Sequence, residues 1–172
     1  MSSIEIRQCR RDDNKSIADI CYKTGYMGED LSGLNAFNDR VLFSYFFSDY
    51  YPLYESMHSF VAVDKDKENL VVGYIIGTDN SVRQVYKDYP AHLHINILQE
   101  YQHSGIGSAL INSFEKHMKA IGVRGIHLTT SNKNYKAISF YESKGYHLAF
   151  HGSAKVWKVK DYKSLIYVKK LI

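Results

Sequence analysis

The sequence predicts a mixed α/β fold, with a run of strands in the middle of the chain and helices on either side of it. Apolar residues alternate along several short segments, as in half-buried strands, and recur at every third or fourth position along others, as in amphipathic helices. The 172 residues are 45% hydrophobic and 23% charged, which is ordinary for a globular protein with a proper core. No linker, repeat or low-complexity tract divides the chain, so we expect one domain over residues 1–172.

The first third of the chain is expected to hold a strand and two helices. In order, its segments are a short strand with Ile4 and Ile6, a helix with Ile17, Ile20, Cys21 and Thr24 on one face, the glycine loop "GYMGEDLSGLN", and a helical stretch from about Phe37. Asp12 or Asp13 can cap the first helix, because a short polar side chain can accept hydrogen bonds from its free N–H groups.

The remaining segments mix strands and helices. In order, they are strands "FVAV" (60–63) and "LVVGYII" (70–76) joined by the charged turn "DKDKEN", a strand "AHLHINIL" (91–98), a helix to Ile121, a strand "GIHLTT" (125–130), a helix to Lys144, and strands near 146–150 and 164–169. The apolar residues expected to pack the helix that ends at residue 121 on the sheet are Ile106, Leu110, Ile111, Phe114, Met118 and Ile121.

Composition narrows the possible functions. The net charge of +4 would help to hold a phosphate-bearing ligand but is far below that of a nucleic-acid-binding domain. The lysines between 155 and 170 alternate with apolar residues, which favours solvated outer faces of the last strands over a nucleic-acid surface. Cys9 and Cys21 are expected to be free thiols, because two cysteines in a chain without a sign of export rarely form a structural disulfide. Fifteen tyrosines, many between Tyr22 and Tyr89, suggest a lining that is apolar in body and polar at its tip.

The start of the chain, "MSSIEIRQCRR", has no apolar signal core, and no run approaches the ~18 apolar residues of a membrane span. We therefore expect a cytoplasmic or nuclear protein that does not bind membranes.

The stretch "QEYQHSGIGSAL" (99–110) carries the first functional motif. Its pattern, Gln102-x-x-Gly105-x-Gly107, follows a strand and opens a helix, so backbone N–H groups at the helix start can receive an anion. It is not a nucleoside-triphosphate loop, because no Gly-Lys-Ser/Thr follows the glycines. It is not a dinucleotide fingerprint either, because the third small residue and the acidic ribose ligand are missing.

The stretch "SNKNYKAISFYESKGY" (131–146) carries the second motif. Asn134, Ala137, Tyr141 and Lys144 recur at spacings that form one stripe of a helix, which Gly145 ends. A stripe bounded by a polar Asn and a Lys is less typical of a purely structural face than one bounded by apolar residues.

Together the two motifs resemble the GCN5-related N-acetyltransferase (GNAT) family, over most of the chain. The resemblance implies a central mixed, mostly antiparallel sheet of six to seven strands flanked by about four helices, and N-acetyl transfer from acetyl-CoA as co-substrate without a metal. The segments "KTGYMGED" and "AHLHINIL" are also similar to the acetyltransferase-like domain appended to some O-GlcNAc hydrolases.

The resemblance also implies which residues bind coenzyme A. The strand before the glycine loop would hold the pantetheine, the loop would hold the pyrophosphate, and the later helix would line the coenzyme arm. The implied residues are Ile95, Ile97, Leu98, Gln102, His103, Ser104, Gly105, Ile106, Gly107, Ser108, Asn134, Ala137, Phe140, Tyr141 and Lys144.

For catalysis, the resemblance places Tyr141 where a general acid protonates the leaving thiolate. The base is open. His94, on the strand before the loop, can act directly or through water, because histidine ordinarily titrates at ~6.5. Glu29 and Asp30 are the alternatives. Glu29, Asp30, His92 and Asn96 are also expected to contact the acceptor, although the family subgroup would have Asp where Asn96 stands.

Two other functions remain open from the sequence. Without a carboxylate at residue 96, the chain could be a coenzyme-A-binding module with little or no transfer activity. A nucleic-acid interaction domain has only the basic C-terminal strands in its favour. His92 and His94 share a strand face, but two imidazoles need a third ligand to hold a metal. The expected partner is a small-molecule or peptide amine, and the chain is expected to be a monomer or a homodimer.

Overall fold

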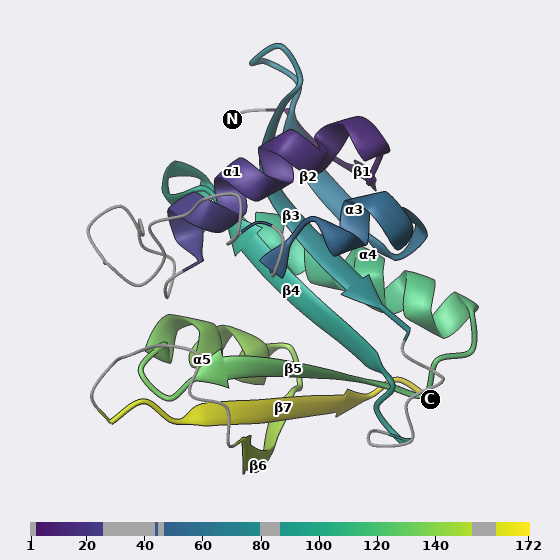
Figure 1. The fold of residues 1–172 in the computed structure, drawn as a ribbon, viewed down its shortest axis with the longest axis vertical. Helices are drawn as coiled ribbons and strands as arrows, with labels where there is room; N and C mark the ends of the chain where they lie inside the picture. Colours follow the sequence, from purple (N-terminus) through teal and green to yellow (C-terminus); the bar gives the residue numbers. More distant parts are fainter. Residues whose placement is uncertain (1–2, 26–43, 45–46, 80–86, 153–160) are drawn as a thin grey trace. The chain divides into compact units, whose positions relative to one another are not determined.

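The computed structural model describes residues 3–25, 44, 47–79, 87–152 and 161–172 (Figure 1). The elements in these residues are β1 (Ile4–Gln8), η1 (Arg11–Asp13), α1 (Asn14–Thr24), α3 (Tyr50–Tyr54), η3 (Ser56–His58), β2 (Phe60–Asp64), β3 (Leu70–Thr78), β4 (Ala91–Ile97), η5 (Gln99–Tyr101), α4 (Ile106–Ala120), β5 (Gly125–Ser131), α5 (Tyr135–Ser143), β6 (His147–Gly152) and β7 (Ser164–Lys170). The mixed α/β prediction is confirmed.

The strands form one seven-stranded sheet in the order β1-β2-β3-β4-β5-β7-β6. Pairing is antiparallel between β1 and β2, β2 and β3, β5 and β7, and β6 and β7. β4 and β5 instead run parallel, with Ala91 opposite Ile126 and His92 opposite His127. A parallel pair needs a long crossover, and the chain from Leu98 to Arg124, which contains α4, is that crossover.

The chain packs as two compact units, and whether it behaves as one domain stays a prediction. The first unit comprises Met1–Thr78 and His94–His117. Within it, β3 is buried from Val71 to Thr78. Successive side chains of a strand point to opposite faces, so both faces of β3 must be covered. α1 and α3 lie on one face and α4 lies on the other (Figure 1).

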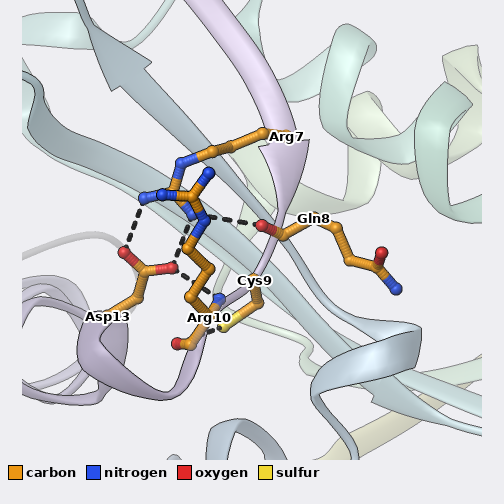
Figure 2. A network of polar contacts seen from close by, with 5 residues as sticks. All are labelled: Arg7, Gln8, Cys9, Arg10 and Asp13. Atoms are coloured by element: carbon orange, nitrogen blue, oxygen red, sulfur yellow. Dashed lines mark hydrogen bonds and ion pairs between the residues drawn. The ribbon is translucent and has the colours of Figure 1, made fainter.

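Helix α1 buries Ile17, Ile20, Cys21 and Thr24, as its sequence pattern predicts. Asp13, which was expected to cap this helix, has another role. Asp13 occupies the N-cap position, but its carboxylate accepts two hydrogen bonds of 2.7 Å from the Arg7 guanidinium and a third, also 2.7 Å, from the Arg10 N–H (Figure 2). Asp13 therefore ties β1 to the start of α1 instead of capping the helix.

The second unit comprises Asp79–Leu93 and Met118–Ile172. β5 pairs with β7 along its whole length, and β7 pairs with β6 on its other edge. Within this unit α5 is linked to β7 by a hydrogen bond of 3.0 Å from the Tyr167 hydroxyl to Glu142 Oε1. β7 is buried from Ser164 to Val168, so the prediction of a solvated outer face along this strand is wrong. Its lysines follow or precede the buried stretch instead of alternating with it.

Two further predictions need correction. Ile121 does not pack on the sheet, because α4 ends at Ala120 and the Ile121 side chain, in the turn that follows, is 46% exposed. The short helix α3 was not expected, because Pro52 and the surrounding tyrosines give no helical period. The helical stretch from about Phe37 lies mostly outside the described residues. Along the described part of the chain, no helix is both long and apolar enough to cross a membrane.

Candidate functional site

The segment between β4 and α4 forms a tight turn in the first unit. After β4, the Leu98 N–H donates to the Val72 carbonyl at 2.9 Å, and η5 follows. The backbone then takes two left-handed conformations, at His103 with φ of +59° and at Gly105 with φ of +87°. Helix α4 begins at Ile106. Glycine adopts a positive φ at little cost, which explains why Gly105 stands immediately before the helix.

This turn leaves the start of α4 open to an anion. The N–H groups of a first helical turn have no acceptor inside the helix, and Gly105 has no side chain that could cap them. The first intrahelical bond runs from Ala109 N–H to the Gly105 carbonyl at 3.1 Å. A Cβ built on Gly105 would meet no atom within 4 Å, so open space lies beside the backbone there. A phosphate group fits such a turn, because the helix dipole favours negative charge at this end.

The individual loop residues differ in what they can offer an anion. Gly107 lies inside α4, and only Gly105 of the two glycines has a positive φ. The Ile106 side chain is buried, so this residue can contribute only its N–H. The Ser104 hydroxyl donates to the Tyr101 carbonyl at 2.5 Å and stabilises the turn itself.

The Gln102 side chain bonds to the end of β4, a contact that the sequence motif did not predict. Its side-chain Nε2 donates to the Ile97 carbonyl at 3.1 Å, and its backbone N–H donates to the Gln99 carbonyl at 3.2 Å. The first residue of the motif therefore connects the end of β4 to the loop through its side chain.

The polar residues of β4 each have a distinct environment. The rings of His92 and His127 are 4.9 Å apart, within the second unit. In the first unit, the His94 ring meets the ring of Tyr51 edge to face, with centroids 5.8 Å apart. The Asn96 amide accepts a hydrogen bond of 3.2 Å from the Tyr74 hydroxyl and donates one of 2.8 Å to Thr24 Oγ1. Asn96 thus bonds to α1 and β3, where the sequence suggested a contact with an acceptor.

The groups around Asn96 and His94 keep their protons at neutral pH. Burial raises the pKa of the Cys21 thiol to about 11. Burial also raises the pKa of Tyr51 to about 12, with smaller contributions from Tyr50 and Glu55, and it raises the pKa of Tyr74 well above its usual value. The sequence predicted Thr24 only as part of a helix face, and the only signal for Tyr51 and Tyr74 was the tyrosine richness of this part of the chain.

Helix α5, in the second unit, is held at both ends. At its start the Asn134 side chain accepts a hydrogen bond of 3.1 Å from the Ala137 N–H, so Asn134 is the N-cap and not a member of a helical stripe. At its end, Gly145 has a φ of +82°, its N–H donates to the Glu142 carbonyl, and the Tyr146 N–H donates to the Tyr141 carbonyl. This is the Schellman arrangement that closes a helix.

Tyr141 lies in the last turn of α5 and is 8% exposed. Its ring contacts those of Phe140 and Tyr146, at centroid distances of 5.6 and 5.9 Å. Burial raises the pKa of its hydroxyl. No residue in the described part of the chain forms a hydrogen bond with that hydroxyl. Lys144 follows the helix and places its ammonium 5.8 Å from the centre of the Phe140 ring.

Some predicted site residues are therefore brought together and others are not described. Within the first unit, His94, Asn96 and residues 95–98 adjoin the turn of residues 102–108 along one continuous stretch of chain. Within the second, Asn134, Ala137, Phe140, Tyr141 and Lys144 belong to α5 and its caps. Glu29 and Asp30 lie outside the described residues. Residues 3–25, 44, 47–79, 87–152 and 161–172 contain no group of three or more His, Cys, Asp or Glu side chains that could hold a metal.

Comparison with known proteins identifies a family and similar folds. The model of the acetyltransferase (GNAT) family matches residues 30–146. The crystal structure of SsHAT superimposes with a TM-score of 0.83 and 23% identity, covering 99% of each chain. Salmonella typhimurium yncA, solved with its cofactor acetyl-CoA, has a TM-score of 0.72 and 15% identity, covering 99% of this chain and 95% of that one. The ribosomal-protein-S18-alanine N-acetyltransferase of Escherichia coli has a TM-score of 0.69 and 19% identity, covering 98% and 94%.

Proposed function

The chain belongs to the acetyltransferase (GNAT) family, and on that premise we propose that it transfers the acetyl group of acetyl-CoA to an amine. The acceptor is a small amine or an amino group of a peptide or protein. The observation that carries the proposal is the turn before α4, where Gly105 has a φ of +87° immediately before a 15-residue helix. That turn suits the pyrophosphate of coenzyme A.

Three segments of the chain form the proposed coenzyme site. The backbone of residues 95–98 holds the pantetheine in the manner of an added strand. The N–H groups from about His103 to Ser108 receive the pyrophosphate. The residues of α5 and its caps line the coenzyme arm, and this last assignment rests on the motif that contains Asn134, Ala137 and Tyr141.

Acetyl-CoA supplies, when bound, a thioester whose carbonyl carbon an amine can attack directly. A backbone N–H near Ile97 steadies the charge that develops on the carbonyl oxygen. Tyr141 then donates its proton to the departing sulfur, whose pKa resembles the ~8.5 of cysteine. The burial of Tyr141 supports this role, because a raised pKa keeps the hydroxyl protonated, and no described residue competes for its proton.

The amine must lose a proton before or during attack, and we propose that His94 takes it. Its position on β4, next to the segment proposed to hold the thioester, supports this role. The neighbouring Tyr51 keeps its own proton at neutral pH, because its pKa is raised to about 12, and so it does not compete as a base. Glu29 and Asp30 remain the alternative bases.

A second function has an observation in its favour. Asn96 stands where the narrower subgroup, the acetyltransferase-like domain of O-GlcNAc hydrolases, would have Asp. Both ends of its amide are bonded inside the protein. If no other group takes the proton, the chain would bind coenzyme A without robust transfer. Membership of that subgroup and a cytoplasmic or nuclear location also stay predictions.

Two measurements on the unmodified chain test these proposals. Isothermal titration calorimetry with acetyl-CoA, and separately with duplex DNA, should detect binding of the first and none of the second. A thiol-release assay over a panel of small amines and amine-bearing peptides should then detect turnover with at least one acceptor. Absence of acetyl-CoA binding would refute the coenzyme site. Tight binding without turnover on any acceptor would favour the binding module over the enzyme.

A further inference from the structure

A chain of hydrogen bonds in the first unit links β4 to α1 and β3. The Thr24 hydroxyl donates to the Ile20 carbonyl at 2.7 Å, and Asn96 Nδ2 donates to Thr24 Oγ1 at 2.8 Å. On the other side of the amide, the Tyr74 hydroxyl donates to Asn96 Oδ1 at 3.2 Å. Tyr74 also lies close enough to Cys21 of α1 for the two groups to influence each other's pKa. These hydrogen bonds therefore connect Tyr74 of β3, through Asn96 of β4, to Thr24 and the Ile20 carbonyl of α1.

The Ile20 carbonyl fixes the direction of every hydrogen bond in this series. A carbonyl oxygen can only accept, so the single proton of Thr24 points to Ile20. Thr24 can then only accept from residue 96, which requires an N–H on that side. The carbonyl end of the Asn96 amide consequently faces Tyr74, whose proton it accepts.

This direction requires an amide at residue 96. An ionised carboxylate has no proton to donate to Thr24, so Thr24 would have to turn away from the Ile20 carbonyl or face the carboxylate with a lone pair. An apolar side chain of similar size would leave both Thr24 and Tyr74 without their partner, and an unsatisfied buried polar group is costly. An amide at residue 96 thus meets the need to accept and donate at once.

The same end of β4 is held by three further contacts. Gly73 of β3 allows a close approach, because a Cβ there would lie 3.0 Å from Ile97 Cγ1 and 3.3 Å from the Asn96 carbonyl oxygen. The Leu98 N–H donates to the Val72 carbonyl at 2.9 Å. Gln102 Nε2 donates to the Ile97 carbonyl at 3.1 Å. Residues 96–98 are therefore constrained from α1, from β3 and from the glycine loop.

We propose that Asn96 is a positioning residue for acetyl transfer: its amide, bonded to Thr24 and Tyr74, fixes the backbone of residues 95–98 in the position that receives acetyl-CoA. The inference rests on the proposed function, since it assumes that this backbone holds the coenzyme. Asn96 itself touches neither the acetyl group nor the amine. Asn96 instead preorganises the backbone of residues 95–98. Without it, this backbone would have to become ordered on binding, and affinity would fall.

Replacing Asn96 by Asp tests this role, because acetyl-CoA binding by the variant should then depend on whether the new carboxyl group is protonated. A protonated carboxylic acid resembles an amide, because it donates through its O–H and accepts through its C=O. The titratable groups near the amide are Cys21 on α1, Tyr74 on β3, His94 on β4, and Asp49 and Tyr51 at α3. Cys21, Tyr51 and Tyr74 keep their protons below pH ~8, because burial raises their pKa values.

The experiment measures the acetyl-CoA dissociation constant of Asn96→Asp relative to the unmodified chain, at pH 8 and at pH 5. At pH 8 we expect binding weakened by about tenfold, the scale of one buried hydrogen-bond partner lost. At pH 5 the ratio should shrink toward one as the carboxyl group takes up a proton, because partial burial and the need to donate to Thr24 favour the protonated form and raise its pKa above the ~3.9 of a free aspartate. Because both proteins are measured at each pH, effects of pH on acetyl-CoA, on His94 and on Asp49 cancel in the ratio of their dissociation constants. A ratio that is large at both pH values, or near one at both, overturns the inference.

Two further variants separate positioning from general destabilisation. Thr24→Val keeps the side-chain volume but removes the acceptor, so it should weaken acetyl-CoA binding to a similar extent at both pH values. It also decides the question if Asn96→Asp does not fold, because unchanged affinity in folded Thr24→Val overturns the inference. Ser59→Ala is the control, since it loses a buried hydroxyl bond of 3.2 Å to the Glu55 carbonyl elsewhere in the same unit. It should lower the melting temperature without changing acetyl-CoA affinity. Absence of acetyl-CoA binding by the unmodified chain would instead refute the proposed function.

Discussion

At the scale of single residues, the Tyr141 hydroxyl combines burial of its ring with the absence of a hydrogen-bond partner among the described residues. A buried tyrosine ordinarily bonds its hydroxyl to a neighbour. By contrast, Tyr167 bonds to Glu142 and Tyr101 bonds to Asp64. With no partner among the described residues, the Tyr141 hydroxyl can interact with a ligand, and its raised pKa keeps it a donor at neutral pH.

We expect Tyr141→Phe to leave acetyl-CoA affinity nearly unchanged and to lower turnover by ~10²-fold or more, the usual contribution of a positioned acid. Calorimetry and a steady-state thiol-release assay measure the two quantities. Tyr167→Phe is a matched control, because it removes a hydroxyl from the same unit without touching the proposed acid. Equal turnover of Tyr141→Phe and the unmodified chain would return Tyr141 to a packing role.

His94 yields a prediction that depends on pH. If it accepts the proton of the amine, turnover should rise with pH through the histidine range near ~6.5, because only the neutral imidazole is a base. His94→Gln should flatten this rise while acetyl-CoA binding stays nearly intact. A rise near pH 9 that ignores the substitution would mean that the amine loses its proton to solvent, and the protein would then catalyse by positioning alone.

At the scale of elements, the turn before α4 depends on the backbone freedom of Gly105. We expect Gly105→Val to abolish acetyl-CoA binding in folded protein, because a branched side chain would occupy the open space beside the first N–H groups of α4. Gly107→Ala should bind nearly normally, since Gly107 already has helical backbone geometry. Calorimetry of the purified variants measures both.

Gly122 offers a matched control for the strain of this substitution. Its φ is +78° and a Cβ there would also meet nothing within 4 Å, but it follows the opposite end of α4. Gly122→Val should therefore show a comparable loss of stability, ~1–2 kcal/mol, with acetyl-CoA affinity intact. Undiminished affinity in folded Gly105→Val would remove the basis for the proposed anion site.

At the scale of the whole molecule, the pair Arg7–Asp13 makes stability depend on pH. Burial by itself raises the pKa of Asp13, but the hydrogen bonds from the Arg7 guanidinium and the Arg10 N–H outweigh it and leave the pKa below its usual value (Figure 2). A carboxyl group whose pKa is lower in the folded state stabilises that state above its unfolded pKa of ~3.9. The stabilisation is lost as the pH falls through the folded pKa.

We expect Asp13→Asn to lower the free energy of unfolding by about 1–3 kcal/mol at pH 7, because Arg7 loses a charged partner. The difference from the unmodified chain should shrink as the pH falls below ~4. Urea unfolding at pH 7, 4 and 3 measures it. Glu5→Gln, at an exposed pair with Lys65, is the control and should change stability by less than ~0.5 kcal/mol. A pH-independent deficit for Asp13→Asn would contradict the linkage.

Much of the fold could be predicted because the spacing of apolar residues along the sequence indicates which positions are buried. Ile17, Ile20, Cys21 and Thr24 share a helical face in any environment, and the alternation of Ala91, Leu93, Ile95 and Ile97 marks a strand before its neighbours are known. The glycine motif was likewise visible, because a positive φ restricts the residue type locally. α3 escaped prediction because five residues around a proline contain too little period to be recognised.

The sequence by itself determined most of the order of elements, the glycine motif and the candidate acid, since each depends on residues close together along the chain. Only the tertiary structure decided which partner each polar side chain has. Asn96 reaches Thr24 across 72 positions and Tyr74 across 22, so no local pattern could distinguish an acceptor ligand from a brace of β4. Asp13 was visible as a helix cap, yet its carboxylate bonds to Arg7, because the geometry of β1 brings the stronger charged donor within 2.7 Å.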